Sequence, residues 1–320
     1  MFFPGGRLRG MRAVDLGYVA RAPNVRLPFV FPDHPAGGFE VVTDALGLRR
    51  DQPLPGRTIP RVLVLGDSHM DGVLENRENM CHRIETALAQ RGTPAAVLNA
   101  SVGGTTFVNH LGALVRLREL SPALIVVVVY GGNDFYEQVL LERYVRGMPE
   151  PTSTQQALRR VLDSKRDGHA GRSGFVSQEL QQALYFDANP GDEALAVAAA
   201  VETLWAAQQT AEAMGATFLA VYLPTATAVE PSTFAARVNE CLELAEGAPT
   251  ALLATERLKR GLLEGLGRAG VDFIDLFDTL ANSGEACYWP SDLHLSIVGH
   301  RHAATALETA VAQRLAAGPR

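Results

Sequence analysis

Short, continuous apolar runs that alternate with helical segments place the strongest constraint on the fold of this chain. One run covers Val62 to Leu65 and ends at Gly66, and another covers Leu124 to Tyr130. Runs of this kind are typical of strands buried on both faces, which occur in parallel sheets covered by helices. Parallel strands need a crossover between them, and the intervening helical segments supply it. The sequence therefore predicts an α/β fold with a doubly wound, mostly parallel sheet.

The alternation divides the chain into parts. Residues 61–320 predict one three-layer α/β/α domain with helices at 192–214 and 298–316, and with five strands at 62–65, 95–98, 124–130, 217–223 and 271–275. Residues 1–60 are rich in proline and glycine, and predict an N-terminal extension or cap. The stretch 137–190 breaks the alternation, with one predicted helix at 155–163. We interpret this stretch as an insertion that forms a lid or a specificity wall.

The composition excludes several classes of protein. The formal net charge is −6 and basic residues occur in short pairs, which argues against a nucleic-acid partner. No apolar stretch is long enough to span a membrane, and the N-terminus lacks the apolar run of a signal peptide. The chain as given is expected to be cytoplasmic, or extracytoplasmic if a leader has been removed. Three scattered cysteines do not form a disulfide framework or a zinc site, so no metal or cofactor is expected.

Polar residues that suit catalysis follow the predicted strands at their carboxyl ends. Ser68 follows the first strand, Gly104 the second and Asn133 the third, while Asp292 and His294 lie beyond the fifth strand and before the last helix. The carboxyl ends of parallel strands meet at one edge of the sheet, where ligands bind. We therefore expect these residues to converge on one site.

The residue types at this edge are those that acyl transfer requires. A serine hydroxyl becomes a good nucleophile when a histidine takes its proton and an acid orients the imidazole, and Ser68, His294 and Asp292 supply these three groups. The oxyanion formed on attack needs hydrogen-bond donors, each of which stabilises the transition state by about 3 kcal/mol. The backbone N–H groups of Ser68 and Gly104 and the side chain of Asn133 are the predicted donors.

These four stretches resemble the SGNH (GDSL-like) hydrolase superfamily, whose sequence blocks are marked by Ser, Gly, Asn and His in that order. The matching residues are Ser68, Gly104, Asn133 and His294, and the resemblance covers residues 61–316 apart from the insertion. It implies the flavodoxin-like SGNH fold and a serine esterase mechanism. The last block departs from the common D-x-x-H spacing, because Asp292 lies two residues before His294. This D-x-H spacing resembles branches that act on polysaccharide O-acetyl groups.

The expected function is hydrolysis of an acyl ester, either a short-chain ester or an O-acetyl ester such as that of a carbohydrate. The expected partner is thus a small-molecule or glycan ester, while the oligomeric state stays open. Three alternatives remain: an O-acyltransferase that uses the same site, a non-catalytic binding module on the same scaffold, and a metal-assisted hydrolase centred on Asp292, His294 and His300. The sequence does not decide the acyl chain length or the alcohol of the substrate.

Two further features have competing interpretations. His69 follows the nucleophile and either contacts the substrate or packs beside the turn, and packing is the favoured interpretation. Gly265, Gly267 and Gly270 match G-x-G-x-x-G, but a helix precedes them and a strand follows, which is the reverse of a dinucleotide-binding site. We expect these glycines to form a helix cap and a turn.

Overall fold

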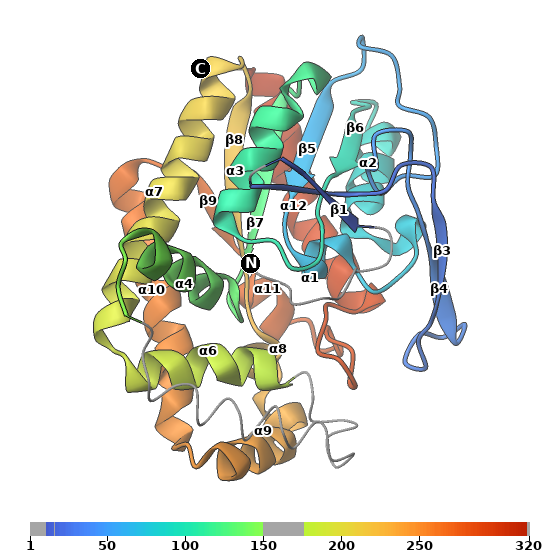
Figure 1. Cartoon of the computed structure of the whole chain (residues 1–320). Helices are drawn as coiled ribbons and strands as arrows, with labels where there is room; N and C mark the ends of the chain where they lie inside the picture. The colour runs from blue at the N-terminus through green and yellow to red at the C-terminus, as the bar shows by residue number, and fades with distance from the viewer. Residues whose placement is uncertain (1–10, 16, 150–175, 319–320) are drawn as a thin grey trace.

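A central parallel sheet is flanked by helices on both faces (Figure 1). The structure, a computed structural model, describes residues 11–15, 17–149 and 176–318. The five strands of the sheet are β5 (Arg61–Leu65), β6 (Ala96–Asn99), β7 (Leu124–Tyr130), β8 (Thr217–Leu223) and β9 (Phe273–Asp275). Their spatial order is β6-β5-β7-β8-β9, and all neighbours are parallel. The predicted α/β fold with five parallel strands is therefore confirmed.

Alternate side chains of each strand pack into two separate apolar cores. Val62 and Val64 face one core, and Leu63 and Leu65 face the other. The first core is covered by α2 (Met80–Gln90), α8 (Ala226–Val229), α9 (Pro231–Ala245), α11 (Phe277–Ala281) and α12 (Ile297–Ala317). The second is covered by α3 (Phe107–Arg116), α4 (Asp134–Val145), α7 (Gly191–Ala213) and α10 (Leu253–Ala269). The predicted helices 192–214 and 298–316 correspond to α7 and α12.

The described ends of the stretch interpreted as an insertion belong to the helical layers. Helix α4 buries Val139 completely, and α6 (Val176–Ala188) buries Tyr185 and Phe186. Leu180 of α6 joins one core, whereas Tyr185 and Phe186 join the other. Helix α6 therefore contacts both faces of the fold at the lower end of the sheet in Figure 1. The predicted helix at 155–163 lies outside the described residues.

The glycines of the G-x-G-x-x-G match have different roles. Gly270 ends α10 in the left-handed conformation (φ 68°), as expected of a helix cap. Gly265 and Gly267 lie inside α10, so the expectation that all three form a cap and a turn is wrong. A Cβ on Gly265 would lie 2.5 Å from Cγ2 of Val201 on α7. Gly265 therefore allows these two helices to approach closely.

The N-terminal part of the chain forms two hairpins that pack against the domain. They comprise β1 (Met11–Asp15) with β2 (Tyr18–Arg21), and β3 (Arg26–Val30) with β4 (Gly38–Val42). The β3–β4 hairpin stands at the right-hand edge in Figure 1. The first hairpin ends in a buried ion pair: Arg21 Nε donates to Asp71 Oδ1 at 2.9 Å, and both residues are at most 6% exposed. Asp71 is the last residue of α1 (Ser68–Asp71).

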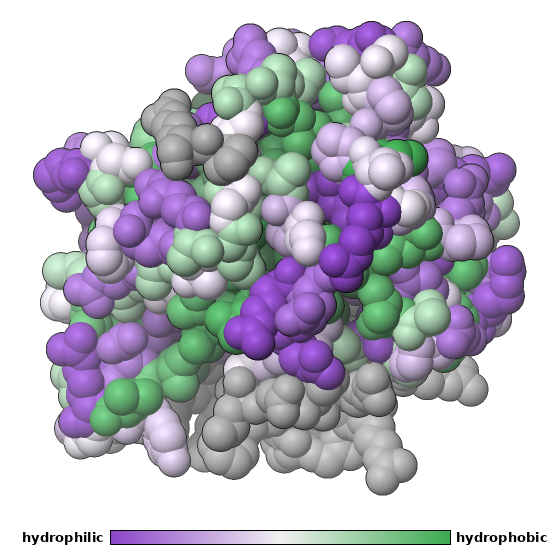
Figure 2. All heavy atoms as spheres, turned by 90° about the horizontal axis from the view of Figure 1, so that it is seen from above, coloured by the Kyte–Doolittle hydropathy of each residue, from purple (hydrophilic) through white to green (hydrophobic). Residues whose placement is uncertain are grey.

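The surface of the described part of the chain is mixed in character. Figure 2 shows hydrophilic and hydrophobic residues interspersed over the face seen from above. Among the described helices, none combines the length and the apolar character that a membrane crossing requires.

The Arg21–Asp71 pair should contribute far more to stability than an exposed pair of the same kind. Asp71→Asn leaves Arg21 buried without its counterion, so the free energy of unfolding in denaturant should fall by about 3 kcal/mol. The matched control is Glu40→Gln, which removes the exposed Arg26–Glu40 pair and should cost less than about 1 kcal/mol. Equal losses in the two variants would contradict the buried pair's role as an anchor.

Candidate active site

The structure brings Ser68, His294 and Asp292 together at the carboxyl edge of the sheet. Ser68 begins α1 directly after β5, while Asp292 and His294 lie in the loop before α12. Ser68 Oγ lies 2.9 Å from His294 Nε2, and His294 Nδ1 lies 3.1 Å from Asp292 Oδ2. Both distances are within hydrogen-bond range. The three residues thus form a continuous hydrogen-bonded chain from hydroxyl to carboxylate.

The short spacing between Asp292 and His294 depends on an unusual backbone conformation. Leu293 between them is left-handed (φ 61°), which costs a non-glycine residue about 1–2 kcal/mol. The resulting turn lets Asp292 Oδ1 accept the backbone N–H of His294 at 3.0 Å while Oδ2 accepts from the ring. One carboxylate therefore fixes both the backbone and the ring of His294. This explains how a D-x-H spacing can orient an imidazole.

The contacts of His294 determine its protonation state. Burial lowers the pKa of His294, but the hydrogen bond and the charge of Asp292 outweigh burial and raise it above its ordinary value. Because the carboxylate accepts at Nδ1, the ring proton lies on Nδ1 and the lone pair of Nε2 faces Ser68. The imidazole is therefore arranged to accept the hydroxyl proton of Ser68.

A stack of three rings supports the imidazole of His294. His69 lies between Tyr130 and His294, with ring centroids 3.6 Å and 4.6 Å away. His69 is 3% exposed, and burial together with the charge of His294 places its pKa well below the ordinary value. Tyr130 is anchored in turn, because its hydroxyl donates to Glu179 of α6 at 2.6 Å. The structure places His69 as a neutral packing partner of His294, with little surface left for a substrate.

The three predicted oxyanion donors border the same edge. Ser68, Gly104 and Asn133 are each partly exposed. Gly104 is left-handed (φ 76°), a conformation that glycine adopts without strain. Asn133 directly precedes α4 and its Nδ2 donates to Glu137 Oε1 at 3.1 Å. The loops after β5, β6 and β7 thus carry Ser68, Gly104 and Asn133 at the same edge of the sheet.

Hydrogen bonds between the loops hold these groups in place. Thr105 Oγ1 donates to the carbonyls of Gly66 and Val102 at 3.1 Å and 2.7 Å, which ties the Gly104 loop to the Ser68 turn. Thr106 Oγ1 donates to the carbonyl of Asp134 at 3.2 Å, which ties the same loop to α4. The loops of Ser68, Gly104 and Asn133 therefore form one connected network.

The carboxyl end of the nucleophile turn is fixed by Arg49, which the sequence did not single out. Its guanidinium donates to the carbonyls of Asp71, Gly72 and Leu74, and its Nε donates to Asn76 Oδ1 at 2.8 Å. Arg49 is 5% exposed. Its sequence neighbours, Leu48 and Arg50, gave no signal of burial, because arginine is usually exposed unless it is paired.

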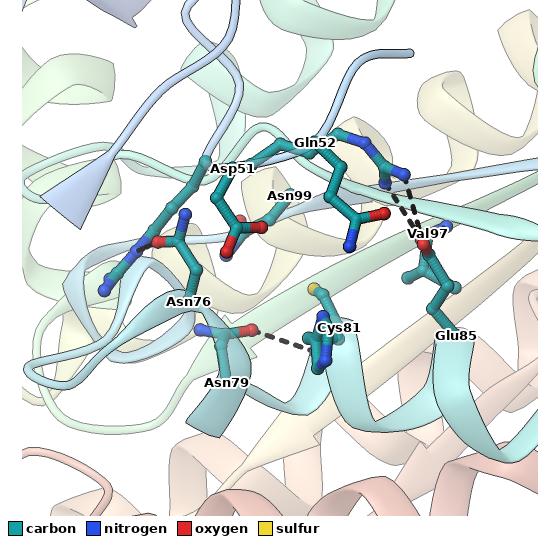
Figure 3. A pocket seen from close by; sticks show the side chains of 11 residues that line it. Asp51, Gln52, Asn76, Asn79, Cys81, Glu85, Val97 and Asn99 are labelled. Carbon is teal, nitrogen blue, oxygen red and sulfur yellow. Dashed lines mark hydrogen bonds and ion pairs between the residues drawn. The ribbon is translucent and has the colours of Figure 1, made fainter. Parts of the chain in front are cut away.

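A polar pocket lies behind this turn and is shown in Figure 3. Asn79 and Asn99, which line it, both donate to the carbonyl of Met70 in α1, at 2.9 Å and 3.0 Å. Arg50 donates twice to Glu85, at 2.9 Å and 3.1 Å. The polar side chains of the pocket are thus largely engaged within the protein, and Ser68 is not among the lining residues. We therefore assign the pocket to the support of α1, not to substrate binding.

The geometry does not favour the metal-assisted alternative. His300 is fully buried, its Nδ1 accepts the N–H of Met80 at 3.2 Å, and burial lowers its pKa to about 3. Asp292 is occupied by His294. Within the part of the chain that the structure describes, no group of three or more His, Cys, Asp or Glu side chains is arranged to hold a metal ion.

Comparisons with solved structures find similar folds at low sequence identity. The chain is 16% identical to TesA, with a TM-score of 0.45, over 79% of this chain and 99% of that chain. It is 13% identical to LAE5 from the metagenome of Lake Arreo, Spain, with a TM-score of 0.45, over 80% and 96% of the two chains. It is 10% identical to a mutant of Axe2, an acetylxylan esterase from Geobacillus stearothermophilus, with a TM-score of 0.45, over 80% and 94%.

The family comparison is more direct. No curated protein matches the chain. Residues 64–302 match the GDSL-like Lipase/Acylhydrolase family, a range that covers most of the chain and includes Ser68, Gly104, Asn133 and His294. This match confirms the resemblance to the SGNH hydrolases. The chain belongs to the GDSL-like Lipase/Acylhydrolase family.

Proposed function

We propose that this acyl ester hydrolase uses Ser68 as its nucleophile, His294 as general base and Asp292 to orient the imidazole. The observation that carries the proposal is the 2.9 Å contact between Ser68 Oγ and His294 Nε2, with Asp292 bound to the opposite ring nitrogen. A hydroxyl hydrogen-bonded to a histidine that is itself held by a carboxylate is the arrangement that activates serine for acyl transfer.

The proposed reaction proceeds in two halves. Ser68 Oγ attacks the ester carbonyl and its proton passes to His294 Nε2. The bond from the carbonyl carbon to the alcohol oxygen then breaks, and His294 gives the proton to the departing alcohol. Water attacks the acyl-serine, its proton passes through His294 to Ser68, and the carboxylic acid leaves. The N–H groups of Ser68 and Gly104 and the amide of Asn133 stabilise the oxyanion in both halves.

The proposed substrates are short-chain or O-acetyl esters, with carbohydrate esters as one class. Ser68 is partly exposed, and it lines neither the polar pocket behind α1, nor the apolar cavity under β5, nor the groove along α3. A partly exposed nucleophile that lines none of these three hollows of the described residues suits a small acyl group on a bulky alcohol. An alcohol that replaced water in the second half-reaction would make the same site an O-acyltransferase, which product analysis with an acceptor sugar distinguishes.

Removing the Ser68 hydroxyl should abolish hydrolysis of p-nitrophenyl acetate above the uncatalysed background. We expect Ser68→Ala to lower kcat at least about a thousandfold, because the acyl-enzyme route is lost. The control Ser291→Ala removes a hydroxyl beside Asp292 that holds no member of the triad, and should leave kcat within about twofold. Undiminished turnover in Ser68→Ala would exclude the proposed nucleophile, and loss of wild-type activity on chelation would favour the metal-assisted alternative.

The dependence of kcat/KM on pH should report His294. The neutral imidazole is the active form, so activity is present above its pKa and is lost as the pH falls through it. Because Asp292 raises this pKa, the midpoint of the acid limb should lie above 6.5. Asp292→Asn should move the midpoint to lower pH and reduce kcat by about a hundredfold or more.

The matched control for this profile is Asp33→Asn. The Asp33 carboxylate accepts the N–H of Ser291 at 2.7 Å, so it contacts the loop that carries His294 without holding the ring. The acid-limb midpoint of kcat/KM in Asp33→Asn should therefore equal that of the wild type. A midpoint that is the same in Asp292→Asn and in the wild type would show that Asp292 does not set the pKa of the catalytic base.

A further inference from the structure

Glu137 is an acidic side chain beside the site that the proposed mechanism does not yet use. It lies on α4, one turn after Asn133, and its backbone N–H donates to the Asn133 carbonyl at 3.0 Å. Its Oε1 accepts from Nδ2 of Asn133 at 3.1 Å. Its Oε2 is shielded from solvent and has no hydrogen-bond partner among the described residues. Shielding a carboxyl oxygen in this way costs free energy, so Glu137 is not explained by stability alone.

The conformation of Asn133 is also unusual. Asparagine at the N-cap of a helix ordinarily uses its side-chain oxygen to accept a backbone N–H of the first turn. Asn133 occupies the N-cap of α4, yet its side chain caps no N–H in the described structure and is directed to Glu137 instead. Glu137 therefore competes with the capping interaction that would otherwise fix the amide.

We infer that Glu137 is a positioning residue that holds the amide of Asn133 as an oxyanion donor, an inference that rests on the proposed function. A primary amide has two N–H groups. Glu137 accepts from Asn133 Nδ2 and so fixes which end of the amide is the nitrogen. The other N–H of Nδ2 is then free for the oxyanion on the acylated Ser68. Without Glu137, the Asn133 side chain rotates so that its amide oxygen caps α4, and Nδ2 no longer points to the oxyanion.

The electrostatic surroundings of Glu137 suit this role. The pKa of Glu137 is raised to about 7, because burial and the neighbouring Asp67 carboxyl outweigh the hydrogen bond from Asn133, which lowers it. Asp134 is buried beside Asp67 and has a pKa well above its ordinary value. Near neutral pH much of the Glu137 population is thus uncharged, and a neutral acceptor repels a developing oxyanion less than a carboxylate does.

The test measures kcat and KM of p-nitrophenyl acetate hydrolysis in a double-mutant cycle on Asn133 and Glu137. Glu137→Ala should lower kcat about tenfold with little change in KM, because the donor is displaced only where it meets the transition state. Glu137→Gln keeps an acceptor oxygen and should stay within about threefold of the wild type. Adding Glu137→Ala to Asn133→Ala should have no further effect, because Glu137 acts through the amide. Glu142→Gln, on the same helix, is the control and should match the wild type.

Three results would overturn the inference: wild-type kcat in Glu137→Ala, independent losses in the Asn133→Ala background, or equal losses in the Ala and Gln variants at unchanged melting temperature. If Glu137→Ala does not fold, the Gln variant decides the question, because a tenfold loss of kcat in that variant contradicts the inference. Failure of the proposed function is distinguishable, because Ser68→Ala would then remain active whatever the Glu137 variants show.

Discussion

The hydrogen bond between Ser68 and His294 joins two residues that are 226 positions apart in the chain, and the rest of the structure serves to make it possible. Ser68 is placed by the first strand of the sheet and His294 by the loop between the last strand and α12. A parallel sheet collects its carboxyl ends at one edge, so side chains far apart in sequence meet there. The two apolar cores that clamp the sheet fix the distance between the loops. The contact is thus a property of the whole domain.

Several local features of the site reduce the stability of the fold, and burial of the two apolar cores offsets them. Leu293 is left-handed, and Asp67 Oδ2, Asp134 Oδ1 and Glu137 Oε2 are shielded oxygens without a partner among the described residues. Burial raises the pKa of Asp67 to about 6 and that of Asp134 far above its ordinary value. These features would be eliminated from a site that only had to be stable. These four residues belong to the loops and the helix start that carry the proposed oxyanion donors and the proposed base, where orientation and charge would affect the reaction.

The sequence was sufficient for the sheet and for the residues at its edge. Continuous runs such as Leu124–Tyr130 report burial on both faces, and turn residues after each strand report the edge, because both signals are local. The contacts of Arg21 and Arg49 were not predictable from the sequence. Arg21 and Asp71, for example, are 50 positions apart, and an ion pair between distant residues leaves no periodic pattern. The left-handed conformation of Leu293 was not predictable either, because leucine rarely adopts it. Glu137 was visible four residues after Asn133, but acidic residues on a helix usually face solvent.

The most direct test of Ser68 as the nucleophile is covalent labelling of the intact protein with a fluorophosphonate, followed by peptide mapping. The hydroxyl oxygen of an activated serine attacks the phosphorus of this probe. The resulting phosphonyl-serine resembles the tetrahedral intermediate and remains bound to the serine oxygen. We expect one phosphonylated residue, Ser68, and no label in a His294→Ala variant that keeps the melting temperature of the wild type. Equal labelling of the His294→Ala variant, or a label on another serine of the active enzyme, would show that Ser68 activated by His294 is not the catalytic nucleophile.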